Sequence, residues 1–401
     1  MLTVNQISLL ILLIIWITII FFASLDFRRK RKLKFHPPIS FIIPCYNDEK
    51  TIENTIRSIY ASYKKDKIDL IVINDHSTDN SPSILKDLRK EFGFRLINNK
   101  KNLGKAKSIN THYSLAKHEL LWVVDSDIVV NQEAIESILA RFQADPKLAA
   151  ANCAYKIKYT GWWSVMQQME SNMMSMILLS HNLLSTLYIW GGCVAIRKDI
   201  FQKVGGFSET MLTEDADLAF KINQHKFHVQ HSLASVEVYG AEGFREWVKQ
   251  RMRWLSGTTH CYLKYIKVWI KHPLHVIFLL LFTVLSITFI ASLLNEAIFF
   301  NQIFDMYALL RETMSRLGSL KILGFYSGFI LLGWILSKFY FLVFSIPYTI
   351  PMMVNYKHWY KIFYVIPFVL IYFPILSLVA IVSAIKAMVT FPFIENKKRA
   401  W

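Results

Sequence analysis

The stretch "LWVVDSDIVV", Leu121–Val130, decides the fold of the more polar part of this chain. Four apolar residues, typical of a buried strand, run into two acids, Asp125 and Asp127, where the strand would end. Alone, such a pair also occurs as turn or capping acids. Two carboxylates this close raise each other's pKa, however, and a hard divalent cation with oxygen ligands compensates both. Such an ion takes its remaining ligands from water and phosphate.

Two other stretches have the same form. "ISFIIPCYND" (Ile39–Asp48) and "LIVINDHSTD" (Leu70–Asp79) are apolar runs that end in polar residues, and helical patterns at Glu49–Tyr63 and Ser81–Phe92 alternate with the runs. This alternation predicts an α/β domain with a doubly wound, mostly parallel, Rossmann-like sheet, whose ligands bind at the carboxyl ends of the strands. Four acids fall at or just past such ends: Asp75, Asp79, Asp125 and Asp127.

Composition indicates a membrane protein. Of the 401 residues 53% are hydrophobic, and 46 Lys and Arg against 29 Asp and Glu give a net charge of +17. Basic loops on the inner side of a membrane and an anionic lipid surface account for this charge, so we expect no nucleic-acid partner. The four cysteines form no CxxC pair, which argues against a disulfide framework or a zinc site.

The N-terminal segment has the pattern of a membrane anchor. Ile7–Leu25 is almost uncharged and long enough to span a bilayer, and the basic flank Arg28–Lys34 follows it. A cleaved signal peptide has its positive charge before the apolar run, so we expect an uncleaved anchor over residues 1–34 with its N-terminus outside. Residues 35–240 then form a cytoplasmic domain.

The C-terminal part, residues 273–401, returns to membrane composition. Together with the anchor, four spans would leave the basic end Asn396–Ala400 outside, against the positive-inside rule. Either one segment is re-entrant or the rule is broken here. We expect a multi-pass protein of the bacterial inner-membrane type. The long apolar runs are Leu274–Leu294, Leu323–Tyr348 and Ile362–Val389.

A second acidic pair stands in "MLTEDADLAF", Met211–Phe220. Glu214 and Asp215 fall where a helix is expected to begin, with Thr213 as its N-cap. Acids in a first turn are also ordinary partners of the helix dipole, so the pattern alone does not establish a site.

Residues 241–272 have an interfacial pattern. In "GFREWVKQRMRWLSG", Gly243–Gly257, the apolar residues fall on one broad helical face, typical of a helix on a membrane surface. Gln250, Arg253 and Trp254 stand at i, i+3 and i+4, so they share one side and can reach a common ligand. An interfacial aromatic residue with snorkelling cations would give the same pattern.

Taken in order, Asp75, D-x-D at 125–127, T-E-D at 213–215 and Q-x-x-R-W at 250–254 make a specific set. With membrane segments at both ends, the chain resembles the membrane-embedded family-2 glycosyltransferases of the GT-A fold. These include the processive synthases of cellulose, hyaluronan and poly-β-1,6-N-acetylglucosamine. Chain length and the single N-terminal span are most similar to the bacterial poly-β-1,6-N-acetylglucosamine type.

The resemblance implies roles for single residues. Pro44 and Tyr46 would flank the uracil of a UDP-sugar. Asp75 would bind the base or ribose, and Lys105 would lie near the nucleotide. Asp125 would contact the nucleotide, and Asp127 would bind Mg²⁺ or Mn²⁺. Asp215 would be the general base with Glu214 beside it, while Gln250, Arg253 and Trp254 would line the acceptor entrance and steady the diphosphate.

This sequence also departs from the family pattern. His76 stands at a position that is usually small, and "VYGAEGFREW", Val238–Trp247, replaces a Glu-Pro-Thr-like turn common in polymer synthases. The acceptor side is therefore the part that the resemblance defines least.

The implied activity is an inverting transfer of a sugar, N-acetylglucosamine from UDP-GlcNAc, to a growing β-linked polysaccharide that crosses the membrane. One displacement needs a base for the acceptor hydroxyl and positive charge on the leaving diphosphate, and both are available here. The alternative is a single transfer to a membrane lipid of the ceramide or diacylglycerol type; a third reading is a sugar-binding subunit with a decayed transferase domain. Expected partners are the UDP-sugar, a glycan or lipid acceptor, the bilayer and a small accessory membrane subunit.

Overall fold

The computed structural model describes residues 14, 17–26, 28–29, 31–158, 160–272, 275–276 and 363–394. The chain divides into two compact units, Met1–Thr18 with Leu274–Pro374, and Ile19–Pro273 with Ile375–Trp401. Each unit is described by itself. The predicted span Leu323–Tyr348, and all but two residues of the predicted span Leu274–Leu294, lie outside the described residues.

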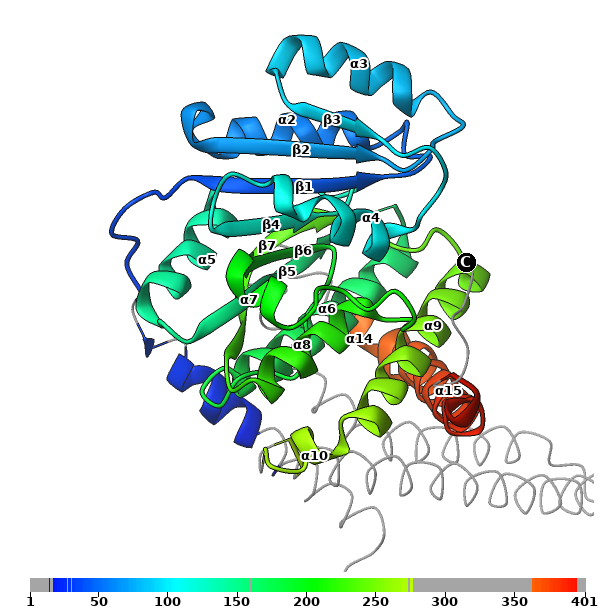
Figure 1. The fold of residues 1–401 in the computed structure, drawn as a ribbon. Helices are drawn as coiled ribbons and strands as arrows, with labels where there is room; N and C mark the ends of the chain where they lie inside the picture. Colours follow the sequence, from blue (N-terminus) through cyan, green and yellow to red (C-terminus); the bar gives the residue numbers. More distant parts are fainter. Residues whose placement is uncertain are drawn as a thin grey trace, which may run out of the picture. The chain divides into compact units, whose positions relative to one another are not determined.

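A seven-stranded sheet forms the centre of the second unit, with the strand order β3-β2-β1-β4-β6-β5-β7 (Figure 1). Only β6 runs antiparallel to its neighbours β4 and β5; the other pairs are parallel. The mostly parallel, doubly wound sheet predicted from sequence is confirmed. The strands are β1 Ile39–Cys45, β2 Ile68–Asn74, β3 Arg95–Asn98, β4 Leu120–Val124, β5 Leu148–Ile157, β6 Cys193–Arg197 and β7 His228–Val238.

Helices connect these strands. The predicted helix Ser81–Phe92 is found with the same bounds, whereas the helix predicted from Glu49 begins at Ile52. The amides of Thr51 and Ile52 both donate to the carbonyl of Asp48, so the preceding residues form a turn. The α-helices described between β1 and residue 272 are α2 Ile52–Ser62, α3 Ser81–Phe92, α4 Lys105–His112, α5 Gln132–Ala144, α6 Trp162–His181, α7 Lys198–Lys203, α8 Glu214–Gln224, α9 Phe244–Lys264 and α10 Ile266–Trp269.

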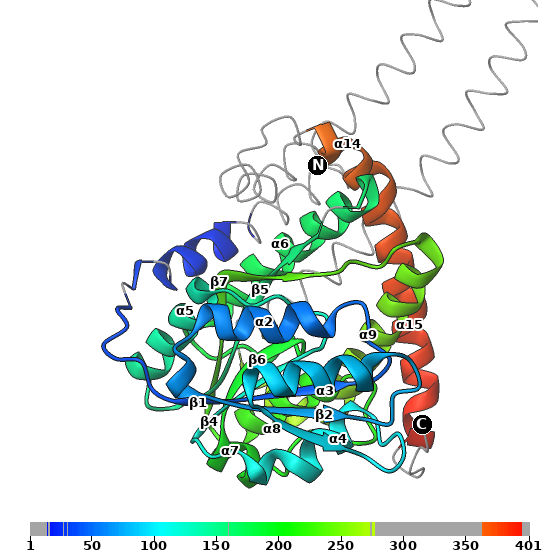
Figure 2. The same ribbon diagram turned by 90° about the horizontal axis from the view of Figure 1, so that it is seen from above.

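Alternate residues of the central strands enter two separate cores. Phe41 of β1 stacks on Trp122 of β4 at 5.6 Å between ring centroids, in the core that α2, α3 and α5 cover. Ile42, the next residue of β1, packs in the core that α4, α7 and α8 cover. In Figure 2, α2 and α5 lie on one side of the strands and α4, α7 and α8 on the other. Helices on both faces leave the carboxyl edge of the sheet for a ligand.

The predicted anchor ends in a helix, Ile17–Asp26, that is fixed to the domain. Asp26 is buried and forms ion pairs with Arg31 at 2.6 Å and with Arg141 of α5 at 3.0 Å. Arg31 of the basic flank therefore forms an ion pair with a buried residue of the protein.

Among the described residues, one helix is long and apolar enough to cross a bilayer: Phe373–Phe391, within α15 (Phe373–Ile394). One side of α15 packs on α9, where the Ser256 hydroxyl donates to the carbonyl of Ser383 at 3.3 Å and His260 Nε2 lies 3.2 Å from the carbonyl of Ala387. In the first unit, α14 (Val365–Pro367) leads into a π-helical turn at Phe368–Tyr372. Large apolar side chains of α15 are exposed: Leu378, Val382, Ile385, Met388 and Val389.

Candidate active site

Polar residues gather at the carboxyl edge of the sheet. Because β1, β2 and β4 are parallel neighbours, their carboxyl ends meet there. Tyr46 follows β1, Asp75 follows β2, and Asp125 and Asp127 follow β4. The clustering predicted from sequence is present in the structure.

Lys105 links the acidic motifs. It is the first residue of α4, after Gly104 in the left-handed region at φ 80°. Its ammonium nitrogen lies 2.6 Å from an oxygen of Asp125 and 3.6 Å from one of Glu214. Burial lowers the pKa of Lys105, but these two carboxylates outweigh burial and hold the pKa above its ordinary value. Lys105 therefore stays charged between the D-x-D and T-E-D motifs.

Three carboxyls of this cluster have raised pKa values. Burial raises the pKa of Asp127, and the charge of Asp125 adds to it, giving about 6. Burial and the charge of Glu214 raise the pKa of Asp215 to about 6, although Lys105 opposes the shift. The pKa of Asp125 is also raised by burial, against the pull of Lys105. Excess negative charge of this kind suits a site that receives a cation.

The D-x-D turn is held by its middle residue. Ser126 is buried; its hydroxyl donates to Asp48 at 2.5 Å, and its carbonyl accepts from the Thr55 hydroxyl of α2 at 2.8 Å. The flanking side chains of Asp125 and Asp127 remain partly exposed. Among the described residues no three His, Cys, Asp or Glu side chains form a complete metal cage. Two acids that leave other positions to water and phosphate fit Mg²⁺ or Mn²⁺.

Asp75 organises the loop before α4. Its buried carboxylate accepts hydrogen bonds from the amides of Leu103 at 2.9 Å and Gly104 at 2.8 Å, and from the Asn99 side chain at 2.7 Å. These contacts fix the start of α4 and hence Lys105, a role that the sequence did not indicate. The predicted contact of Asp75 with a base or ribose stays a prediction.

The two residues expected to wall a base differ in exposure. Pro44 is buried within β1, whereas the Tyr46 side chain is 47% exposed just past the strand end. His76, after Asp75, is exposed and has φ 64°, in the left-handed region that favours glycine. His76 thus has a backbone conformation that glycine adopts readily, which explains why the family usually has a small residue at this position.

Asp215 begins α8 with Glu214 and contacts a glycine pair, the Gly191–Gly192 turn. One carboxylate oxygen accepts from the amide of Gly191 and the other from that of Ala216, both at 2.8 Å. A Cβ at Gly191 would lie 2.7 Å from Cβ of Asp215, so glycine is required there. The glycine pair that immediately precedes β6 was the available sequence signal for this contact.

The helix with the Q-x-x-R-W motif packs directly on the T-E-D loop. A Cβ at Gly257 of α9 would lie 2.7 Å from the Thr213 side chain, and Arg253 donates to the carbonyl of Leu212 at 3.2 Å. Further along, the buried Asp217 of α8 accepts from Lys264 at 2.7 Å. Arg253 and Asp215 are therefore positioned by one helix pair, α8 and α9.

Gln250 and Trp254 are held by a residue that the sequence did not single out. Arg251 is buried and forms an ion pair with Glu170 of α6 at 2.7 Å. It also donates to the side-chain oxygen Oε1 of Gln250, and its guanidinium lies 4.5 Å from the Trp254 ring centroid. Trp247, expected on a membrane-facing side of α9, is instead completely buried. Part of that apolar face therefore serves internal packing.

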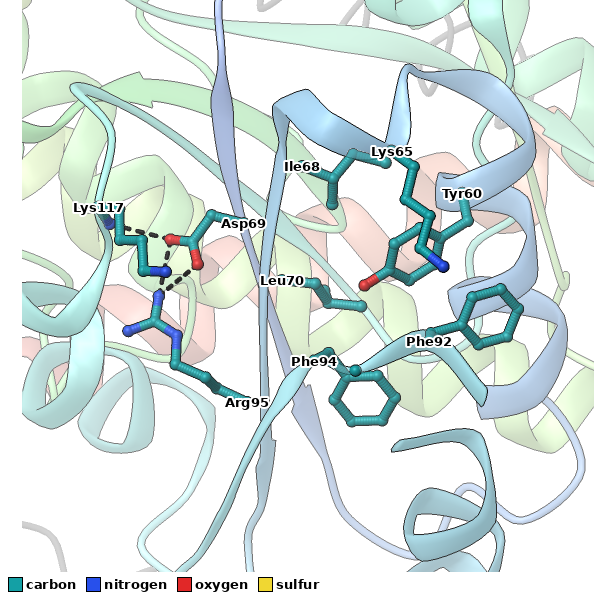
Figure 3. Close-up of a pocket in the computed structure, with 10 residues that line it drawn as sticks. Tyr60, Lys65, Ile68, Asp69, Leu70, Phe92, Phe94, Arg95 and Lys117 are labelled. Carbon is teal, nitrogen blue, oxygen red and sulfur yellow. Dashed lines mark hydrogen bonds and ion pairs between the residues drawn. The ribbon is translucent and has the colours of Figure 1, made fainter. Parts of the chain in front are cut away.

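A cavity of about 160 Å³ lies elsewhere, at the amino ends of β2 and β3. Figure 3 shows Tyr60, Phe92 and Phe94 on one side of β2 and the ion pair of Asp69 with Arg95 on the other. Because ligands of doubly wound sheets bind at the carboxyl ends, this cavity is separate from the candidate active site.

Part of this chain is similar to known proteins. Residues 40–205 match the family model "Glycosyl transferase family 2". Poly-beta-1,6-N-acetyl-D-glucosamine synthases are 27% identical in Staphylococcus aureus and 26% identical in Staphylococcus epidermidis over 225 residues, 55% of this chain and 54% of each relative. The matched region thus spans about half the length of these relatives.

Among solved structures, a mannosyltransferase from Pyrobaculum calidifontis in complex with GDP-Man and Mn²⁺ has the same fold. The TM-score is 0.57 at 17% sequence identity, and the match covers 86% of this chain and 98% of that chain. The GT-A type of α/β fold is confirmed.

Proposed function

We propose that this chain, whose residues 40–205 match the family model "Glycosyl transferase family 2", transfers N-acetylglucosamine from UDP-GlcNAc to a growing β-linked polysaccharide. The observation that carries the proposal is the meeting of Lys105, Asp125 and Glu214 beside Asp215 at the carboxyl edge of the sheet. The sequence similarity to poly-beta-1,6-N-acetyl-D-glucosamine synthases supports the choice of sugar.

The chemistry is a single displacement at the anomeric carbon. An acceptor hydroxyl forms the new C–O bond, Asp215 takes its proton, and the bond to the diphosphate breaks, which leaves UDP and an inverted glycosidic centre. With a pKa of about 6, Asp215 is charged near neutral pH yet basic enough to accept that proton. No carboxylate nucleophile is needed in one displacement.

Two cationic side chains, Lys105 and Arg253, can stabilise the negative charge of the leaving diphosphate. Lys105 stays protonated beside Asp125, and Arg253 lies next to the T-E-D loop through the carbonyl of Leu212. Asp127 would hold Mg²⁺ or Mn²⁺ while Asp125 contacts the nucleotide, and the bound ion would supply further charge to the diphosphate.

The acceptor and membrane roles belong to the same proposal. The α9 helix contacts the T-E-D loop through Gly257 and contacts the apolar helix α15 through Ser256. A growing glycan that leaves Asp215 along α9 would reach the membrane region, consistent with transfer across the bilayer from a cytoplasmic domain. A small accessory membrane subunit remains part of this proposal.

The test supplies radiolabelled UDP-sugars one at a time, with Mg²⁺ or Mn²⁺, to the detergent-solubilised chain. Products are then separated by size and by extraction into organic solvent. Label from UDP-GlcNAc in a large water-soluble product is the expected result. Label confined to the lipid phase would replace the polymer by a ceramide- or diacylglycerol-type acceptor, and no transfer from any UDP-sugar would overturn the proposal.

A further inference from the structure

The Gly191–Gly192 turn uses all four of its backbone polar groups. The Gly191 amide donates to Asp215 at 2.8 Å, and the Gly191 carbonyl accepts from Lys105 at 3.1 Å. The Gly192 carbonyl accepts from the amide of Asp125 at 2.7 Å. Three of the four partners are thus residues of the candidate active site, which makes this turn the backbone link between D-x-D and T-E-D.

The fourth partner is Tyr155 of β5, which belongs to none of the sequence motifs. The amide of Gly192 donates to the Tyr155 hydroxyl at 2.9 Å. A Cβ at Gly192 would lie 2.6 Å from that hydroxyl oxygen, so the turn fits directly on it. The Tyr155 ring also packs on Trp190, with 4.6 Å between centroids, immediately before the turn.

We propose that Tyr155 is a positioning residue for the transfer reaction: its hydroxyl holds the Gly191–Gly192 turn and thereby fixes Asp215 relative to Lys105 and Asp125. This inference deepens the proposed function and rests on it for the role of Asp215. Tyr155 itself touches no reacting atom in this scheme. It acts through the amide of Gly192.

The hydroxyl group, rather than the ring, carries the role. The ring packs on Trp190 with or without its oxygen. Among the described residues, that oxygen is the one acceptor of the Gly192 amide. Leaving a backbone amide without an acceptor costs more free energy than exchanging its hydrogen bond for one to water. The turn would therefore shift until the Gly192 amide found another acceptor. A shift of the turn displaces the amide that binds Asp215.

The experiment compares Tyr155→Phe with the matched control Tyr63→Phe in the full chain. Tyr63 is buried, whereas Tyr155 is partly buried, and the Tyr63 hydroxyl donates to the carbonyl of Pro37 at 2.5 Å, outside the candidate site. Amide hydrogen exchange is followed in peptides that contain Gly191 and Gly192, and steady-state transfer is measured with UDP-GlcNAc. We expect exchange in these peptides to accelerate about tenfold or more only in Tyr155→Phe.

For transfer, we expect kcat of Tyr155→Phe to fall about tenfold, with the KM for UDP-GlcNAc within about threefold of wild type. The displaced Gly191 amide changes the position of Asp215, whereas Lys105 keeps its ion pairs with Asp125 and Glu214, which do not depend on the turn. Unchanged exchange at the turn would overturn the inference, as would an equal loss of kcat in Tyr63→Phe. If the wild-type chain transferred no sugar, the proposed function would fall while amide exchange still decided whether Tyr155 holds the turn.

Discussion

Asp215, the proposed base, can accept a proton only when its carboxylate is charged. Burial and Glu214 raise its folded-state pKa to about 6, above the ordinary value for aspartate, so the group becomes protonated as the pH falls through about 6. We therefore expect kcat to be constant above neutral pH and to fall about tenfold per pH unit below about 6. The measurement is kcat against pH at saturating UDP-sugar, and a flat profile down to about pH 5 would contradict the assignment.

The substitution Asp215→Asn tests the proposed base role separately from donor binding. Asp215→Asn keeps the size of the side chain but removes the basic oxygen, so transfer should fall by about 10²-fold or more while UDP binding changes little. Asp87→Asn on the exposed surface of α3 is the matched control. Titration calorimetry with UDP and a transfer assay give the two readouts. Normal turnover in Asp215→Asn would show that another group takes the proton.

Asp127 has a different predicted role. Asp127→Asn removes the proposed anionic metal ligand. The increase in UDP affinity that Mg²⁺ or Mn²⁺ produces, about 1–3 kcal/mol for a typical coupling between two ligands, should therefore be lost. UDP affinity is measured with the metal ion and with a chelator, in wild type, in Asp127→Asn and in the control Asp87→Asn. If the variant responded to the metal ion as wild type does, Asp127 would not be the ligand.

The sequence indicated these residues but not how they are held. Acids at a strand end or in the first turn of a helix follow from local patterns, which is why Asp125, Asp127 and Asp215 could be named from sequence. The partners Tyr155 and Gly191 lie far from them along the chain, and Arg251 belongs to none of the motifs. Such contacts depend on which strands pair and which helices pack, information that no local pattern contains.

At the scale of elements, the contact of α9 with the T-E-D loop makes a prediction about Gly257. Replacing a helical glycine by alanine normally stabilises a helix by about 1 kcal/mol. Here the added Cβ would meet the Thr213 side chain at 2.7 Å and Cβ of Leu212 at 3.0 Å. We expect Gly257→Ala to destabilise the fold by about 1–3 kcal/mol and to reduce transfer, because overpacking separates α9 from α8.

Thermal unfolding and the transfer assay test this expectation together. Thr259→Ala serves as the control because the Thr259 hydroxyl donates to the carbonyl of Leu255 within the same helix. A higher melting temperature for Gly257→Ala, with unchanged transfer, would mean that the close contact at Thr213 is not maintained in solution.

Elements differ in how far the sequence defines them. Strands β1, β2 and β4 are mostly apolar, and their approximate positions were predicted. Strand β7 contains buried polar residues such as His231, which hydrogen-bonds Asn152 of β5 at 3.1 Å, so no apolar run marks it. Strand β6 enters the sheet antiparallel, an orientation that depends on the whole connection from β5 and not on its five residues.

At the scale of the whole molecule, two physical effects could attach the chain to a membrane. A net charge of +17 favours adsorption to anionic lipid, an attraction that salt screens over about 8 Å at physiological ionic strength and about 3 Å at 1 M. The apolar side chains exposed along α15, such as Leu378, Val382 and Val389, favour insertion into hydrocarbon instead. The two effects respond oppositely to salt, because screening leaves hydrophobic burial intact.

We expect insertion to dominate. Membranes that contain the full chain are washed with buffer, with about 1 M NaCl, with alkaline carbonate and with detergent, and the chain is followed in pellet and supernatant. The chain should remain in the pellet until detergent is added, since α15 exposes apolar residues over a length that spans a bilayer. A peripheral protein held by charge, used as the control, should leave with salt. Release of the full chain by salt or carbonate would mean that its charge alone holds it to the surface and would remove the support for glycan transfer across the bilayer.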